Sequence, residues 1–190
     1  ISEHNTNTLY HAGNYVFKSN NRGDDWEVIS DNLTLGSKKN VKSFSSGAIA
    51  ESKLEKGLLY YGTDRGLFWT SKNDGKSWEE NSKNIANAYI RSIHPSYFRK
   101  QRVYMAMTGI NYDDLNNYLY TSENYGKDWK RMKGNLPNEP VNIIIEDKIY
   151  ENILYAGMYR GVYISVDRGK TWNILGKEFP MSSVSDIEIE

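Results

Sequence analysis

The chain has 190 residues, and its 24 Lys and Arg balance its 24 Asp and Glu. This balance argues against a nucleic-acid-binding protein, for which a basic surface is typical, and against electrostatic attachment to a membrane. The absence of Cys excludes disulfides, thiolate catalysis and Cys-ligated zinc, and an aromatic content of 13% argues against disorder. No apolar run is long enough to span a membrane as a helix, and we expect no cofactor or metal site.

Runs rich in aromatic and β-branched residues come in pairs along the chain. In chain order these pairs are 9–13 with 15–17, 58–62 with 67–69, 103–106 with 118–120, and 153–157 with 162–164. Each run has the length and composition of a short strand, and a turn separates the two members of a pair. Each pair therefore predicts a β-hairpin.

An eight-residue motif, Ser-x-(Asn/Asp)-x-Gly-x-x-Trp, follows each predicted hairpin, and we call it the box motif. Asn or Asp can accept hydrogen bonds from nearby backbone N–H groups, Gly can adopt the positive φ of a tight turn, and the Ser hydroxyl can add a further bond. The Trp is suited to pack on the hairpin as an apolar anchor. We expect a structural role for these residues, with Asn or Asp bonded to its own turn and Trp largely buried. They are Ser19, Asn21, Gly23, Trp26, Ser71, Asn73, Gly75, Trp78, Ser122, Asn124, Gly126, Trp129, Ser165, Asp167, Gly169 and Trp172.

A short polar strand and then a further strand are expected after each motif, the latter over 41–50, 89–93, 141–145 and 184–189. Successive box Trp residues lie 52, 51 and 43 positions apart, a period typical of propeller blades. The sequence thus predicts an all-β protein, a β-propeller of four-stranded antiparallel blades, in a single domain over residues 1–190. The last strand either closes a four-bladed ring or starts another blade. The abrupt ends and the missing initiating Met favour a sector of a larger propeller.

The box motif resembles the Asp-box, also called the bacterial neuraminidase repeat, and the resemblance covers nearly the whole chain. Families with this repeat include sialidases, family 74 xyloglucanases, sortilin-type receptors and photosystem assembly propellers. More narrowly, the segments Tyr89-Ile90-Arg91-Ser92-Ile93-His94-Pro95-Ser96 and Gly134-Asn135-Leu136-Pro137 are similar to bacterial glycosyl-hydrolase-like and sortilin-like repeat proteins. Three of the four motifs carry Asn where the family consensus has Asp, which keeps the turn but removes its negative charge.

The resemblance implies that the box corners lie on the face opposite the ligand. The turns between second and third strands, and the blade-joining loops 133–140 and 176–183, would then form the functional face. The long insertion 109–117 is the strongest candidate on this face, because loops on a rigid scaffold often carry binding residues. The alternative is a set of solvated turns whose Arg and Asp side chains pair with each other. The candidate ligand-binding residues are Asp64, Arg65, Tyr112, Asp113, Asp114, Tyr159 and Arg160.

Catalysis would require a specific arrangement of acidic side chains in addition to these turns. A glycosidase needs two carboxylates at a defined separation, one of them with a raised pKa. Asp113 and Asp114 are the candidates for such a pair, although neighbouring loop residues point apart as often as together. A sialidase would also need an Arg-Ile-Pro signature, which the chain lacks. The three His residues show no metal-ligand spacing.

These observations favour a non-catalytic propeller module that recognises a protein or a glycan, or acts as a scaffold, in an exported or envelope-associated bacterial protein. The expected partners are that ligand and the remaining blades of a larger propeller. The alternative hypothesis is a glycoside hydrolase, sialidase-like or xyloglucanase-like, with part of its active site outside this chain. Two carboxylates facing each other across a cleft would favour the enzyme. An open aromatic and basic surface would favour binding.

Overall fold

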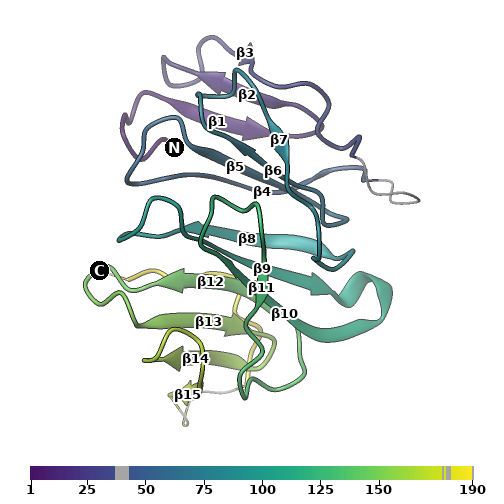
Figure 1. The fold of residues 1–190 in the computed structure, drawn as a ribbon, viewed down its shortest axis with the longest axis vertical. Coiled ribbons are helices and arrows are strands. Elements are labelled where there is room, and N and C mark those ends of the chain that lie inside the picture. The colour runs from purple at the N-terminus through teal and green to yellow at the C-terminus, as the bar shows by residue number, and fades with distance from the viewer. Residues whose placement is uncertain (37–42, 177, 179–180, 190) are drawn as a thin grey trace.

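The computed structural model describes residues 1–36, 43–176, 178 and 181–189. Antiparallel strands form four sheets that follow one another along the chain (Figure 1). We number the sheets as blades 1 to 4. Blade 1 contains β1 (Leu9–Ala12), β2 (Val16–Ser19) and β3 (Glu27–Val28); blade 2 contains β4 (Ser46–Glu51), β5 (Leu59–Thr63), β6 (Phe68–Ser71) and β7 (Glu79–Glu80); blade 3 contains β8 (Tyr89–Pro95), β9 (Val103–Gly109), the 3-10 turn η1 (Ile110–Tyr112), β10 (Asp114–Ser122) and β11 (Lys130–Arg131); blade 4 contains β12 (Val141–Glu146), β13 (Leu154–Met158), β14 (Gly161–Ser165) and β15 (Asn173–Leu175).

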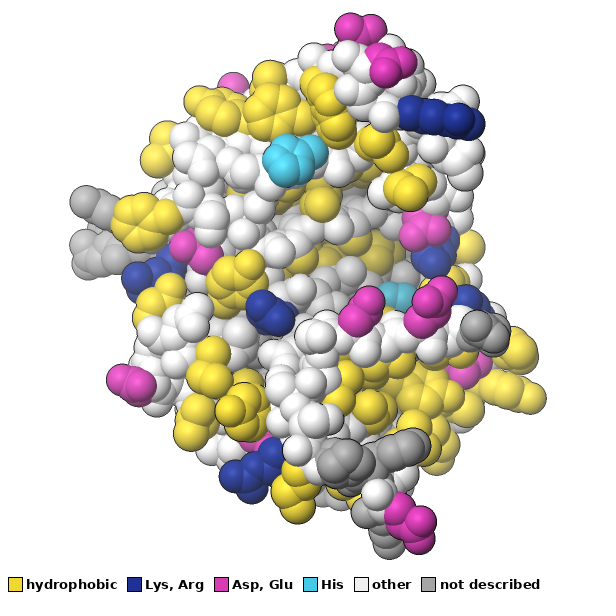
Figure 2. Space-filling view, turned by 180° about the vertical axis from the view of Figure 1, so that it is seen from behind, with side chains coloured by type: hydrophobic (Ala, Val, Ile, Leu, Met, Phe, Trp, Pro, Cys, Tyr) yellow, Lys and Arg dark blue, Asp and Glu magenta, His cyan; other side chains and the backbone are white. Residues whose placement is uncertain are grey.

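The predicted fold class is confirmed: this is an all-β propeller architecture. Within each sheet the strands lie in chain order, and β8, the first strand of blade 3, packs against both β4 and β12. These first strands are therefore neighbours near the propeller axis. The surface turned away from the viewer in Figure 1 is hollowed along its middle (Figure 2). The described sheets do not close into a ring, as expected for a propeller sector.

The strand register places two sets of turns at opposite ends of the molecule. The box turns and the β4–β5, β8–β9 and β12–β13 turns lie at one end of the strands, which we call the box end. The β5–β6, β9–β10 and β13–β14 turns lie at the other, the loop end. In Figure 1 the β9–β10 turn projects to the right and the box end lies to the left. The predicted separation of boxes from candidate loops is therefore present.

Two predicted boundaries were wrong. The expected strand at 184–189 is not formed, and its only backbone hydrogen bond among the described residues runs from Val184 N to Met158 O, at 3.0 Å. A strand requires a ladder of hydrogen bonds to a partner edge, and this segment forms no such ladder with the described strands. The expected insertion 109–117 is shorter, because β10 begins at Asp114 with an irregular register before Tyr118. Residues 41 and 42 of the expected strand 41–50 lie outside the described part of the chain.

The predicted hydrogen bonds of the box turns are present in all four copies. In blade 3, Asn124 Oδ1 accepts the N–H of Asp128 at 2.9 Å, and Ser122 Oγ accepts the N–H of Gly126 at 2.9 Å. Tyr125, between them, has a positive φ of 64°, a conformation that this bonding helps to hold. The equivalent Asn or Asp bonds run from Asp25 N to Asn21, from Ser77 N to Asn73 and from Thr171 N to Asp167.

The hydrophobic core lies between the blades. Each of its three clusters draws side chains from two adjacent blades. Between blades 2 and 3, Phe68 meets Trp129 edge to face, with ring centroids 4.8 Å apart. Between blades 3 and 4, Met132 and Trp172 are both buried in one cluster. Burial of apolar area therefore joins blades to each other rather than stabilising a blade alone.

The box Trp residues are not equally buried. Trp129 and Trp172 are 9% and 3% exposed, and Trp78 is half-buried, but Trp26 is 45% exposed. The prediction was therefore wrong for Trp26. The physical reason is that a box Trp is covered by the preceding blade: Trp78 and Trp129 donate their indole N–H to carbonyls of blades 1 and 2. Among the described residues no blade precedes blade 1.

Buried glutamates join neighbouring blades at the box end. Glu146, which is fully buried, accepts hydrogen bonds from Ser96 Oγ at 2.6 Å and from Tyr104 Oη at 2.9 Å. Glu51 occupies the same place at the end of β4 and accepts a bond from Ser2 Oγ at 2.6 Å. Both carboxylates accept hydrogen bonds from donors of the preceding blade. These bonds offset the cost of burying a carboxylate at the interface between blades.

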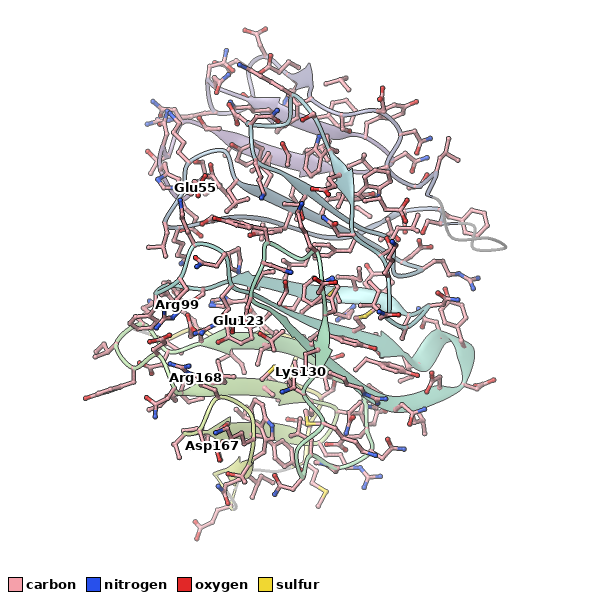
Figure 3. All side chains as sticks on the ribbon, viewed as in Figure 1. Glu55, Arg99, Glu123, Lys130, Asp167 and Arg168 are labelled. Atoms are coloured by element: carbon pink, nitrogen blue, oxygen red, sulfur yellow. The ribbon has the colours of Figure 1, made fainter. Side chains whose placement is uncertain are left out.

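Three arginines surround Glu151 at the same end. Arg99 Nε lies 2.6 Å and a guanidinium nitrogen of Arg102 lies 2.9 Å from its Oε1, and Arg168 approaches it to 3.1 Å. Figure 3 shows the labelled Arg99 and Arg168 on adjacent blades at this end. The hydrogen bond from Arg99, followed by that from Arg102, lowers the pKa of Glu151 to about 2. The β12–β13 turn of blade 4, which carries Glu151, is thereby bound to the β8–β9 turn of blade 3, which carries Arg99 and Arg102.

We predict that Trp129→Ala lowers the free energy of unfolding by about 3 to 5 kcal/mol, as expected for truncation of a large buried aromatic. Trp26→Ala is the matched control, because the same box position is 45% exposed there and loses less buried area. Urea unfolding followed by far-UV circular dichroism measures both. Equal losses for the two variants would contradict an inter-blade role for the box Trp.

We predict that Glu151→Gln lowers stability most at neutral pH. The pKa of this carboxylate falls from 4.5 to about 2 on folding, so its stabilising contribution is present above pH 4.5 and is lost as pH falls toward 2. Unfolding midpoints of the variant and the wild type should therefore converge across that interval. Glu123→Gln is the control, because among the described residues its carboxylate forms a salt bridge with Arg102 alone and is 60% exposed. If the difference in unfolding midpoint between Glu151→Gln and the wild type did not change with pH, the ionised Glu151 carboxylate would not be the source of this stabilisation.

Candidate recognition cleft

A cleft of about 260 Å³ opens at the loop end between blades 3 and 4. Blade 3 contributes the first residues of β8 and the β9–β10 turn, and blade 4 contributes the start of β12 and the β13–β14 turn. No carboxylate is among its described lining residues. They are Tyr89, Arg91, Thr108, Ile110, Asn111, Pro140, Asn142, Tyr159 and Ser183.

The strand geometry explains how the polar groups reach this cleft. Tyr89 and Arg91 of β8 both line the cleft, Arg91 from an irregularity in the β8–β9 register between Ile90 and Ser92, and the Arg91 guanidinium lies 5.7 Å from the Tyr89 ring centroid. Asn142 is held from the other side by donating to Ser183 Oγ at 3.2 Å and to Val184 O at 3.0 Å. Tyr159 is 49% exposed. The cleft therefore presents aromatic rings, amides and one guanidinium.

The structure brings two of the predicted site residues together across blades 2 and 3. The Arg65 guanidinium carbon lies 4.1 Å from the centre of the Tyr112 ring, a cation–π geometry. Arg65 Nε is buried and has no hydrogen-bond partner among the described residues. Its neighbour Asp64 is turned elsewhere and accepts the N–H of Phe44 at 3.1 Å. Asp64 therefore supports the backbone, while Arg65 and Tyr112 form one stacked pair.

Asp113 and Asp114, the candidate carboxylate pair, have different surroundings. Asp113 is exposed and has a left-handed backbone, with φ of 56°. Asp114 instead accepts hydrogen bonds from Tyr118 Oη at 2.6 Å and from Asn116 N at 3.0 Å. The bond from Tyr118 lowers the pKa of Asp114, the opposite of what a general acid requires.

Arg160, the last predicted site residue, pairs with a carboxylate that sequence reasoning missed. Arg160 Nε lies 3.7 Å from Glu139 Oε2, and Arg160 is otherwise exposed. Glu139 is 8% exposed, its Oε1 has no hydrogen-bond partner among the described residues, and burial raises its pKa. Tyr89, Arg91 and Asn142 were also missed, whereas Asn111 lies within the predicted insertion 109–117. For Tyr89 and Arg91 the available signal was their position at the start of an inner strand, next to the loop end.

A family model described as Sortilin-Vps10, sortilin, neurotensin receptor 3, matches residues 66–178, more than half of the sequence. The chain belongs to the Sortilin-Vps10 family. The matched segment runs from the β5–β6 turn past β15 and includes the box turns of blades 2 to 4. No curated protein sequence matches this Sortilin-Vps10 chain.

Solved propellers resemble the Sortilin-Vps10 chain in fold. An ancestral GH74 enzyme aligns with a TM-score of 0.76 at 20% identity, over 94% of this chain and 24% of its own. The GH74 xyloglucanase from Xanthomonas campestris gives 0.65 at 14% identity, over 90% and 28%. YCF48 bound to D1 peptide gives 0.52 at 16% identity, over 84% and 46%. The chain thus spans less than a third of these GH74 enzymes. Identities this low establish a shared fold and not a shared function.

The described residues contain no helix long and apolar enough to cross a membrane.

We predict that Asp113→Ala and Asp114→Ala differ in stability. Asp113 is exposed, so its loss should change the free energy of unfolding by no more than about 0.5 kcal/mol. Asp114→Ala should cost about 1 to 2 kcal/mol, because Tyr118 and Asn116 lose a charged acceptor. Chemical denaturation compares the two variants directly. Equal effects would contradict the structural role assigned to Asp114.

Proposed function

We propose that this chain is a non-catalytic recognition module that binds a protein ligand, through an extended peptide segment, in the cleft between blades 3 and 4. The observation that carries the proposal is the chemistry of that cleft: Tyr89, Arg91, Asn142 and Tyr159 line it, and no carboxylate does among the described residues. Guanidinium and amide groups donate hydrogen bonds to peptide carbonyls and acidic side chains. Tyr rings supply apolar contact area and lose little side-chain conformational entropy on binding.

The comparisons support a protein ligand in two respects. The family is described by the names sortilin and neurotensin receptor 3, and one structural neighbour of the same fold, YCF48, was solved with D1 peptide bound. The neighbouring Arg65–Tyr112 pair extends the same kind of surface toward blade 2. An exported or envelope-associated location, and further blades of a larger propeller as partners, complete the proposal and rest on the family resemblance.

A glycan is the second candidate ligand. It is favoured by the exposed Tyr159 ring, which is suited to stacking on a sugar, and by the GH74 neighbours. A hydrolase would need a carboxylic acid with a raised pKa, and Glu139 beside the cleft is the feature that favours this alternative. Its partner carboxylate would have to come from elsewhere, because the cleft lining described here has none.

We predict that Arg91→Ala and Tyr159→Ala each reduce peptide binding at least about tenfold, the size expected from losing one aromatic or Arg contact at the centre of an interface. Tyr150→Ala is the matched control, because Tyr150 is 58% exposed but lies at the box end. Peptide and glycan arrays probed with the full chain, followed by calorimetry on the hits, supply the measurement.

Other outcomes of this experiment are informative. Glycan hits that depend on Tyr159 would replace the protein ligand with a glycan. Turnover of aryl glycosides that Glu139→Gln abolishes would favour the hydrolase. Binding that survives both cleft variants would overturn the site assignment.

A further inference from the structure

A groove lies between blades 1 and 2 and shares no lining residue with the recognition cleft. Its volume is about 650 Å³, against about 260 Å³ for the cleft. One wall is β3 with the segment 29–35 that follows it, and the other is formed by Trp69 of β6 and the box turn of blade 2. Both walls therefore come from blades that are neighbours within this chain.

Two Trp rings line the groove and are held in place by hydrogen bonds to its opposite wall. The indole N–H of Trp69 donates to Leu33 O at 2.9 Å, and that of Trp78 donates to Ile29 O at 2.8 Å. Both Trp side chains are half-buried. Because their polar atoms are already bonded, the rings offer a ligand their apolar surface, and fixed rings lose little conformational entropy on binding.

The corresponding rings of the next interface are covered. Tyr120 has in blade 3 the register position that Trp69 has in blade 2, and both Tyr120 and the box residue Trp129 are buried. Phe68 packs on Trp129 there, whereas its counterpart in blade 1 is the smaller Val16. Two blades can therefore be joined without leaving these aromatic positions open, so the open pair is not a requirement of the fold.

Polar side chains of both kinds border the two rings. Asp31 of blade 1 and Lys76 of blade 2 line the groove and are exposed. Neither side chain has a hydrogen-bond or ion-pair partner among the described residues. A carboxylate only accepts hydrogen bonds and an ammonium only donates them. The groove thus combines apolar rings with one unpaired acceptor and one unpaired donor.

A sugar has the matching combination of groups. The C–H groups on the faces of a pyranose ring are apolar, and the hydroxyls around its edge both donate and accept hydrogen bonds. The charges of the groove oppose an acidic sugar: Asp74 is paired with Lys18, which leaves the carboxylates of Glu27 and Asp31 against the single ammonium of Lys76.

We propose that this groove binds a neutral oligosaccharide, separately from the ligand of the cleft. Sugar rings stack on Trp69 and Trp78, and their hydroxyls donate to Asp31 and accept from Lys76. The volume of the groove lies within the range of small-molecule sites in proteins.

Calorimetry on the full chain tests the proposal with neutral oligosaccharides of β-linked glucose, β-linked mannose and α-linked glucose. At least one should bind. Trp69→Ala should weaken that binding at least about tenfold, because an aromatic anchor is lost, and Asp31→Ala should weaken it several-fold. Asp24→Ala is the matched control, because Asp24 is an exposed carboxylate of blade 1 outside the groove.

Folding of each variant is checked first by circular dichroism. Trp69→Phe, which keeps a smaller ring, substitutes if Trp69→Ala does not fold, and it should also lower the affinity. The proposal is overturned if none of the three oligosaccharides binds, or if binding is unchanged in both the Trp69 and the Asp31 variants. Binding that only Tyr159→Ala abolishes would assign the glycan to the cleft instead. Binding of a basic peptide but of no glycan, weakened by Asp31→Ala, would replace the oligosaccharide with a peptide.

Discussion

The packing of a box turn on the preceding blade is the interaction on which this structure depends. A single sheet of short strands cannot bury its own apolar face, and the three core clusters all lie between blades. The box turn makes close approach possible because its Gly leaves space for a side chain of the neighbour, and its Trp then closes over the contact. Glu146 and Glu151 add charge-assisted bonds across the same interfaces.

The buried carboxylates and the Glu151 ion pairs that join the blades lie at the box end, whereas the candidate cleft lies at the loop end. At the box end, hydrogen bonds and ion pairs occupy Ser, Asn, Asp, Glu and Arg side chains within the scaffold. At the loop end, Arg91 and Tyr159 keep exposed polar and aromatic surface between two blades whose relative position is set elsewhere. A cleft that is already formed before a ligand arrives would lose little conformational entropy in the binding proposed above.

The features that could be predicted from the sequence are those that depend on residues close together in the chain. The Asn124 turn and the β9–β10 hairpin follow from residues close in sequence, so both were predicted. The exposure of Trp26 and the unpaired 184–189 segment depend on whether a neighbour is present, which no local pattern reports. Within the site, Tyr112 and Arg65 were identified singly, but their stacking arises from the alignment of blades 2 and 3.

Two glutamates show why composition alone could not separate binding from catalysis. Glu151 carries a lowered pKa because three guanidinium groups surround it, whereas burial beside a single, more distant Arg160 raises the pKa of Glu139. Identical side chains thus have opposite electrostatics, which only the packed blades determine. Glu139 has no second carboxylate facing it across the described cleft, while Arg91 and the amides there remain available for ligand acceptors. Among its described lining residues the cleft thus carries one guanidinium and no carboxylate.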